Sequence, residues 1–337
     1  MDHYAGIDVS LECSSLCVVE ASGKIVREDK IATEAAALIG WFASLGLKLV
    51  RIGLEAGPLS QWLFAAMKEA GLAVELVESR HVRNAFKTMA VKTDRKDARG
   101  IAELMRLGWF RPVHCKSLSA QETRAVLNAR KLVDSKLHDI EMSLRGTLRN
   151  FGLKVGKVTE KQFAARVREL VAGHGTLELI AESLLAAHAV LLREFNGLEK
   201  RVRLMARSNR VVRLLMSAPG IGPIVGLTYA SAIDDPERFT SSKSVGAHFG
   251  LAPKRYQSGE TDYTGKISKV GDASVRTALF EAAHVIMTRP VKGGGLKSWA
   301  LRLAKRVGMK KAKVALARRL AVILHRMWAD GTTFKFA

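Results

Sequence analysis

The order of hydrophobic patterns in the first 60 residues limits the fold more than any other feature of the chain. Short apolar runs of strand length occur at 4–8, 16–19 and 24–26. Residues 33–45 then carry apolar side chains at helical spacing, and a strand-like run at 49–55 ends in the turn-forming Ala-Gly-Pro. Three strands, a helix and a further strand predict a mixed α/β layer fold.

Four carboxylates lie where a metal site for phosphoryl transfer would need them. Asp8 belongs to the first predicted strand, and Glu55 ends a later one. At about 100° per residue, Asp94 and Asp97 share a stripe with apolar residues of a predicted helix, so we expect both to point inward. Buried carboxylates need partners, and a divalent cation satisfies several at once. The ordinary alternative is a charged helix start with salt bridges along it.

The ligand types in this set favour Mg²⁺ or Mn²⁺. Two such ions about 4 Å apart activate the attacking oxygen and stabilise the leaving oxygen of a phosphodiester. Zinc is disfavoured because Cys13 and Cys17 have no second Cys/His pair at finger-like spacing, and Cys115 stands alone. We expect the three cysteines to be small buried hydrophobic residues.

The charge balance indicates a polyanionic partner. The chain has 54 Lys and Arg against 32 Asp and Glu, a formal net charge of +22. Residues 1–80 hold 7 basic and 11 acidic residues, whereas residues 284–337 hold 13 basic residues and Asp330 as the single acid. We therefore assign phosphate contacts mainly to the later two thirds of the chain and metal ligands to its beginning.

The hydrophobic runs do not have the length of membrane spans. No run of about 18 uncharged apolar residues is present, and no charged-plus-apolar signal precedes Asp8. Few cysteines at irregular spacing fit a reducing compartment. We expect a soluble, cytoplasmic protein of two compact domains and a connecting element.

Two long helical patterns form that connecting element, separated by a break at 152–159. The first carries Val133, Leu137, Ile140, Leu144 and Leu148. The second continues the 3,4 spacing with Leu177, Ile180, Leu184, His188, Leu191, Phe195, Leu198, Val202 and Met205. We expect a helical hairpin or stalk, in which packing within the chain and a dimer seam are equally compatible with the pattern. We interpret His188 as a core residue rather than a ligand.

Glycine-punctuated segments follow. Residues 217–225 form a turn entering an apolar helix, which either presents backbone N–H groups to a phosphate or serves close helix packing. Residues 250–259 and 265–272 form a basic, Gly-rich loop before another helix. Ser258 in this loop is either a nucleophile or an ordinary turn serine, and residue chemistry alone favours the turn serine.

Five short motifs occur in order along the chain: Gly-Ile-Asp at 6–8, Leu-Glu-Ala at 54–56, Lys-Thr-Asp-Arg-Lys-Asp-Ala-Arg at 92–99, Pro-Gly-Ile-Gly at 219–222 and Tyr-Gln-Ser-Gly at 256–259. As a set they resemble the DEDD transposases of insertion sequences, which are related to the Piv/MooV invertases. The match runs nearly end to end. Gly57 stands where Thr is frequent in the family, which puts a contact near Glu55 in doubt but not the acid itself.

The resemblance implies a RuvC-like, ribonuclease H-type domain, a coiled-coil region and a mainly α-helical transposase domain, over residues 1–118, 119–208 and 209–337. The family's metal-binding tetrad maps onto Asp8, Glu55, Asp94 and Asp97. The family's nucleophile, which forms a 5′-phosphoserine-type link to DNA, maps onto Ser258 and reverses the preference from residue chemistry. Because Ser258 and the tetrad fall in different predicted domains, they must meet through folding or in trans across a dimer.

The resemblance also implies partners and a location. These are donor and target DNA, a structured bridge RNA encoded by the element, Mg²⁺ or Mn²⁺, and protein dimers that pair into tetramers in the bacterial cytoplasm at the nucleoid. Basic residues near the serine are expected to contact nucleic acid, either stabilising charge on phosphoryl oxygens or as nonspecific phosphate contacts: Arg255, Lys266, Lys269 and Arg276.

Two other function classes fit part of the pattern. A RuvC-like, metal-dependent junction-resolving endonuclease would use activated water, with Ser258 dispensable and no covalent intermediate. A non-catalytic nucleic-acid-binding protein would keep the charge without needing four inward-facing acids. The resemblance favours a transposase that cuts and exchanges DNA strands through Ser258.

Overall fold

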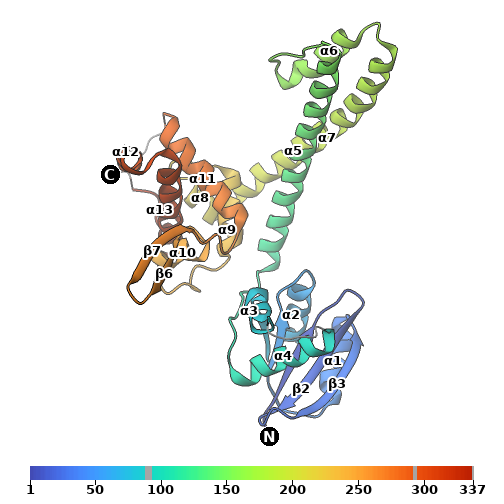
Figure 1. Cartoon of the computed structure of the whole chain (residues 1–337), viewed down its shortest axis with the longest axis vertical. Helices are drawn as coiled ribbons and strands as arrows, with labels where there is room; N and C mark the ends of the chain where they lie inside the picture. The colour runs from blue at the N-terminus through green and yellow to red at the C-terminus, as the bar shows by residue number, and fades with distance from the viewer. Residues whose placement is uncertain (88–92, 291–293, 336–337) are drawn as a thin grey trace. The chain divides into compact units, whose positions relative to one another are not determined.

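A computed structural model describes residues 1–87, 93–290 and 294–335 (Figure 1). The chain forms two compact units, Met1–Lys116 and Ser117–Ala337. The first unit is a mixed α/β structure and the second is mainly helical, which confirms the α/β fold predicted for the beginning of the chain.

The first unit is built around one five-stranded sheet. Its elements are β1 (His3–Asp8), β2 (Cys13–Glu20), β3 (Ile25–Ala32), α1 (Ala35–Ser44), β4 (Leu49–Glu55), α2 (Ser60–Glu69), β5 (Val74–Val77), α3 (Ser79–Ala85) and α4 (Asp94–Leu107). The strand order is β3-β2-β1-β4-β5. β2 is antiparallel to both β1 and β3, whereas β4 is parallel to β1 and β5 is parallel to β4.

Different helices cover the two faces of this sheet. Helices α1 and α2 bury one face, where Ile7 and Leu54 lie in the core. Helix α4 packs on the other face, against β1, β2 and β4. It approaches closely because the facing strand positions are glycines that pair in register: a Cβ on Gly6 would lie 2.2 Å from the Ala98 carbonyl oxygen, and one on Gly53 would lie 2.6 Å from the Ile101 side chain.

Cys17 lies on the sheet face that α4 covers. Burial is the main cause that raises the pKa of its thiol, to about 12, so the side chain is a neutral, small apolar group. Cys17 is thus buried as expected, whereas Cys13 and Cys115 are half-buried; all three are free thiols.

The second unit begins with two long helices and continues into a helical bundle with one hairpin. Its elements are α5 (Leu118–Asn150), α6 (Glu160–Val171), α7 (Gly175–Ser208), α8 (Arg210–Leu215), α9 (Pro223–Ile233), α10 (Ser242–His248), β6 (Pro253–Ser258), β7 (Thr261–Ile267), α11 (Ala273–Thr288), α12 (Gly294–Val307) and α13 (Met309–Ala329). The further division expected at residue 208 stays a prediction.

Helices α5 and α7 pack antiparallel within the chain (Figure 1). Arg130 Nε donates to Glu199 Oε2 at 2.6 Å, and His188 Nε2 lies 3.1 Å from Glu141 Oε1. From Arg130 to Glu141 the chain advances eleven residues in α5, and from Glu199 to His188 it goes back eleven residues in α7, as antiparallel packing requires. Of the two arrangements compatible with the sequence, these contacts show packing within the chain, with His188 in the core; self-association stays a prediction.

The buried stripe of α7 differs from the predicted one at its first turns. Ile180 is 38% exposed, whereas Ala181 and Leu185 are buried. These two residues share a core with Phe163 and Val167 of α6. Helix α7 thus packs against two helices, α5 and α6. A second helical neighbour therefore widens and rotates the buried face.

By length and composition alone, α7 is the one helix in the described parts of the chain that could cross a membrane, with a mean hydropathy of 1.5 over its most apolar window. About a fifth of that window is buried (22%), and its buried residues Leu177, Ala181 and Leu185 have partners in α5 and α6. A helix that packs in the core of a protein can have the same length and apolar composition, so these two properties of α7 are weak evidence for a membrane span.

The turn at 217–225 serves close packing in the second unit. Gly220 has a φ of +74°, and a Cβ there would lie 2.8 Å from the carbonyl oxygen of Ala282 in α11. Helix α9, which follows, is buried from Gly226 to Ile233. These contacts favour the packing alternative for this turn.

The segment interpreted as a Gly-rich loop contains the hairpin β6–β7. All of β6 is exposed, and β7 has only intermediate burial at two positions. Because neither strand buries one face, the sequence has no alternation of apolar and polar residues that would predict strands.

We expect Gly6→Ala to destabilise the first unit, because its Cβ would overlap the backbone of α4. Overpacking of this kind lowers the free energy of unfolding by about 1–3 kcal/mol. The matched control is Gly40→Ala in α1, where nothing lies within 4 Å of the added Cβ. Thermal unfolding of the full chain, followed by circular dichroism, should show a lower Tm for Gly6→Ala only; equal Tm values would contradict the close packing of α4.

Candidate functional site

Asp8 and Glu55 lie together at one edge of the sheet. β1 and β4 are parallel neighbours with Ile7 opposite Leu54, so the next residue on each strand is one of the two acids. Both line one cavity of about 370 Å³, with the loops that follow the two strands. The carboxyl edge of parallel strands is where open α/β sheets hold their ligands.

Two hydrogen bonds within the loop after Glu55 shape one wall of this cavity. Ser60 Oγ donates to the Gly57 carbonyl oxygen at 2.7 Å and accepts from the Gly57 N–H at 2.9 Å. A Cβ at Gly57 would meet only the Glu55 carbonyl oxygen, at 4.0 Å. The space at this position would therefore accommodate a Cβ.

Helix α4 runs antiparallel to β1 and β4, with its first turn toward the same edge. Gly53 lies against Ile101 and Met105, whereas Arg51, two residues earlier in β4, donates to the Met105 carbonyl oxygen at 2.8 Å. The start of α4 is fixed by Thr93, whose Oγ1 accepts from the Lys96 N–H at 3.3 Å. Asp94 and Asp97 occupy this first turn.

The structure does not bring all four predicted acids into one cluster. Asp97 is half-buried, but Asp94 is exposed, so the prediction that both face inward is wrong for Asp94. The physical reason is that the buried stripe of α4 begins one turn later, at Ala98. Within residues 1–87, 93–290 and 294–335, no group of three or more His, Cys, Asp and Glu side chains is close enough to hold a metal ion.

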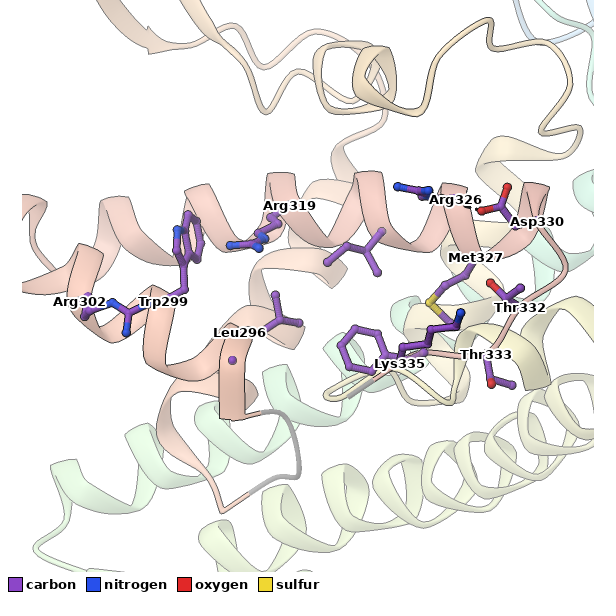
Figure 2. A pocket seen from close by; sticks show the side chains of 13 residues that line it. Leu296, Trp299, Arg302, Arg319, Arg326, Met327, Asp330, Thr332, Thr333 and Lys335 are labelled. Atoms are coloured by element: carbon purple, nitrogen blue, oxygen red, sulfur yellow. Dashed lines mark hydrogen bonds and ion pairs between the residues drawn. The ribbon is translucent and has the colours of Figure 1, made fainter. Parts of the chain in front are cut away.

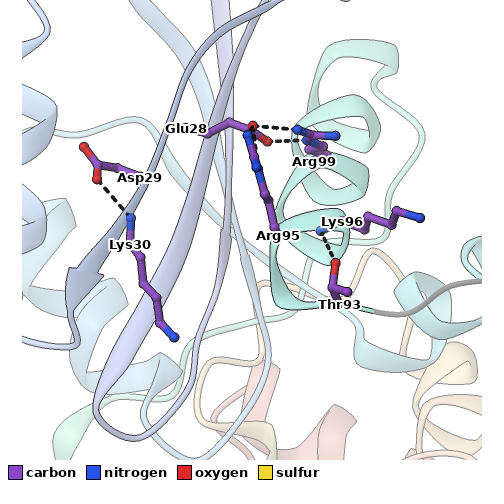
Figure 3. Close-up of polar contacts among 7 residues, drawn as sticks. All are labelled: Glu28, Asp29, Lys30, Thr93, Arg95, Lys96 and Arg99. Carbon is purple, nitrogen blue, oxygen red and sulfur yellow. Dashed lines mark hydrogen bonds and ion pairs between the residues drawn. The ribbon is translucent and has the colours of Figure 1, made fainter.

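Glu28 of β3 holds α4 against the edge of the sheet (Figure 3). Its carboxylate accepts from Arg95 Nε at 2.8 Å and from the Arg99 guanidinium, with one Arg99 bond at 2.6 Å. The Glu28 side chain is only 10% exposed. Arg95 lies in the same turn as Asp94 and Asp97, and Arg99 lies in the next, so this ion-pair cluster sets the position of the acidic turn.

The charge of Glu28 is stabilised strongly by this arrangement. Hydrogen bonds from Arg99, and then from Arg95, lower the pKa of Glu28 from 4.5 to about 2. Sequence reasoning missed Glu28, which is one of four successive charged residues at 27–30. No local pattern identifies it, because its partners lie about 70 residues away in the chain.

Ser258 ends β6 at the tip of the hairpin in the second unit. It pairs with Thr261 across a turn in which Gly259 has a φ of +53°. Both strand ends are exposed. The hydroxyl is therefore accessible, and Ser258 and the four acids belong to different units.

The four basic residues predicted near Ser258 fall into two groups. Arg255 is paired with Asp262 across the hairpin at 2.6 Å, and Arg276 donates to three backbone carbonyls, including Gly271 at 3.0 Å. Both thus have structural partners. Lys266 and Lys269 line a large cavity beside the hairpin.

Comparison with known proteins gives two family matches. A model described as a transposase, of the DEDD type, matches residues 5–152, and the model of the transposase IS116/IS110/IS902 family matches residues 212–293. The chain is 27% identical to the transposase for insertion sequence element IS1111A of Coxiella burnetii, over 98% of this chain and 90% of the relative. It is 24% identical to the transposase for insertion sequence element IS1328 of Yersinia enterocolitica, over 84% and 85%.

We expect Glu28→Gln to loosen the first turn of α4 in a pH-dependent way. The lowered pKa of Glu28 gives stability that is fully present above pH 4.5 and is lost as the pH falls toward about 2. The wild type should therefore exceed the variant in free energy of unfolding by about 1–3 kcal/mol at pH 7, as for a charged hydrogen bond. Urea titrations between pH 7 and 2 measure this difference. A difference that does not shrink on acidification would show that Glu28 acts through packing instead.

Proposed function

The chain belongs to the IS116/IS110/IS902 transposase family and is a DNA-cleaving and strand-transferring enzyme; from this premise we propose that Ser258 is its nucleophile and that the four acids hold its metal. The observation that carries the proposal is the shared cavity of Asp8 and Glu55 at adjacent strand ends. The exposed hairpin tip, where a strand of DNA can reach the serine hydroxyl, supports it.

We assign the first unit to the ribonuclease H-like fold. Three antiparallel strands followed by two parallel ones, in the order β3-β2-β1-β4-β5, support this assignment. In that arrangement the end of β1 and the end of β4 carry the first two acids. The helix that covers the other face supplies the remaining two, Asp94 and Asp97.

A divalent cation, Mg²⁺ or Mn²⁺, fits the donor chemistry of this edge. Asp8 and Glu55 offer carboxylate oxygens to one cavity, and such hard ligands suit either ion. Asp94 and Asp97 would complete the ligand set from the first turn of α4. When bound, the ion supplies positive charge next to the scissile phosphate.

Ser258 performs the covalent step in this proposal. Its Oγ forms a bond to phosphorus while the bond from phosphorus to the 3′ oxygen breaks. The serine loses its proton and the leaving 3′ oxygen gains one, so the DNA is held as a 5′-phosphoserine. A 3′-hydroxyl of another strand then attacks the same phosphorus, which joins the strands and releases the serine.

The partners expected from the family belong to the same proposal. A structured RNA encoded by the element would guide the choice of donor and target DNA, with dimers pairing into tetramers at the bacterial nucleoid. The net charge of +22 supports binding of more than one polyanion. The helix pair α5–α7 would be the coiled-coil region through which copies associate.

A junction-resolving endonuclease with an activated water is the second candidate. The acid pair in the cavity would serve it equally well, because both reactions need a metal next to the phosphate. The two functions differ at the serine, which only the transposase reaction requires.

We expect a covalent protein–DNA adduct when the protein is incubated with Mg²⁺, DNA spanning the element's ends and RNA transcribed from its flanks. On a denaturing gel, Ser258→Ala should abolish the adduct, and Asp97→Asn should reduce it by a factor of about 10² or more, because it weakens stabilisation of the transition state. The control is Ser274→Ala, another exposed serine of the same unit. Cleavage without an adduct, unchanged in Ser258→Ala, would favour the water-using nuclease.

Metal binding can be tested without catalysis. Glu55→Gln should weaken Mn²⁺ binding, measured by electron paramagnetic resonance in the absence of DNA, by about ten-fold or more, because it removes a ligand oxygen. Glu69→Gln removes the same charge from an exposed position in α2 and should leave the affinity unchanged. Equal affinities in both variants would exclude Glu55 as a ligand.

A further inference from the structure

A large groove lies between the hairpin and helices α12 and α13. Its volume is about 1030 Å³. Apolar side chains of both the hairpin side and α13 contribute to its lining, among them Leu251, Ile267 and Val314. A solvated surface does not need such a lining, so the groove is suited to a ligand with flat or apolar parts.

The same groove carries a high positive charge. Six cations line it, and among the described residues that form it none is acidic: Lys266, Lys269, Lys310, Lys311, Arg318 and Arg319. None of the ion pairs found in the described part of the chain involves these six side chains. Their charge is thus uncompensated within the protein, and an anionic ligand would neutralise it.

An aromatic residue connects this groove to a second cavity. Trp299 of α12 stacks with the guanidinium of Arg319 of α13, 4.7 Å from the ring centroid, and both line the groove and an adjacent cavity of about 530 Å³ (Figure 2). Arg302 and Arg326 also line the second cavity; Arg326 is paired with Asp330 at 3.3 Å. Indole and guanidinium planes are the groups on which unpaired bases stack.

These features distinguish an unpaired strand from a duplex. In a duplex the bases are stacked inside, so only phosphates and sugars would reach the groove, and the parts of Trp299 and of the apolar lining that face the groove would contact no base. A single strand offers phosphates to the cations and bases to the ring and the apolar floor at once.

We propose that the groove between β6–β7 and α12–α13 binds an unpaired DNA strand, with Trp299 and Arg319 as its stacking platform. The groove lies at the base of the hairpin, where Pro253 lines it. Ser258 is five residues along the same strand, or about 17 Å at about 3.3 Å per residue. A strand held in the groove would therefore be delivered toward the hairpin tip.

The inference rests on the proposed function only for the choice of DNA as ligand. Binding is measured without divalent ions, so no covalent chemistry occurs. If the groove does not bind the strand while the Ser258 adduct still forms, only the groove assignment fails. If the strand binds but no adduct forms, only the nucleophile assignment fails.

The first test changes charge alone. Anisotropy of a fluorescein-labelled, mixed-sequence 20-nucleotide DNA strand is measured with the full chain at several salt concentrations. In Lys310→Gln/Lys311→Gln, two lost phosphate contacts should lower the slope of log affinity against log salt by about 1.4. The matched control, Lys157→Gln/Lys161→Gln, removes two exposed lysines near the start of α6 and should keep the wild-type slope.

The second test addresses stacking. Trp299→Leu should weaken binding of the strand by about ten-fold, within the range for loss of one stacked base. It should also remove part of the quenching of tryptophan fluorescence that the wild type shows on binding, which a purely structural role would not produce. Thermal unfolding shows whether Trp299→Leu is misfolded. If it is, the Lys310→Gln/Lys311→Gln variant tests the groove instead.

Both binding measurements are repeated with duplex DNA and with single-stranded RNA of the same sequence. Weaker binding of the DNA strand by the groove variants, with little change for the duplex, is the expected result. Equal losses in the two lysine pairs, equal losses for strand and duplex, or tighter groove-dependent binding of RNA than of DNA would overturn the proposal.

Discussion

The close approach of α4 to the sheet is the constraint on which the first unit depends. Gly6 and Gly53 leave no side chain between the strands and the helix backbone, so α4 lies directly on β1 and β4. Its first turn is then directed to the edge where Asp8 and Glu55 end their strands. The Glu28 cluster with Arg95 and Arg99 fixes that turn from the side of β3. Backbone packing and one buried carboxylate thus determine where the acids of α4 lie.

The two units divide the electrostatic requirements of strand transfer. The first unit presents Asp8 and Glu55 at one sheet edge, around one cavity. The second presents uncompensated cations in a groove beside the hairpin that carries Ser258. DNA phosphate would be attracted to the second surface and repelled by the first, so in the proposed reaction a bound metal would allow phosphate to approach the acids. This division explains why a strongly basic chain begins with an acidic segment.

Local patterns predicted some of this architecture and could not predict the rest. Short apolar runs of strand length predicted the α/β fold, with Asp8 in the first strand and Glu55 at the end of a later one, because these features depend on neighbours in the chain. The partnership of Glu28 with Arg99 joins residues 71 positions apart and leaves no local signal. The hairpin was missed because both of its faces are exposed. Asp94 was placed inward because helical periodicity gives the direction of a stripe but not where burial along it begins.

The central claim is that Ser258 and the acids of the first unit act in one reaction. Its most direct test is to trap the protein on DNA spanning the element's ends, trim the DNA with nuclease and locate the remaining nucleotide by tandem mass spectrometry. We predict a single modified peptide with the nucleotide on Ser258, present with Mg²⁺ and absent from protein carrying Asp8→Asn. A nucleotide on another side chain, or an unchanged yield in the Asp8 variant, would contradict the account.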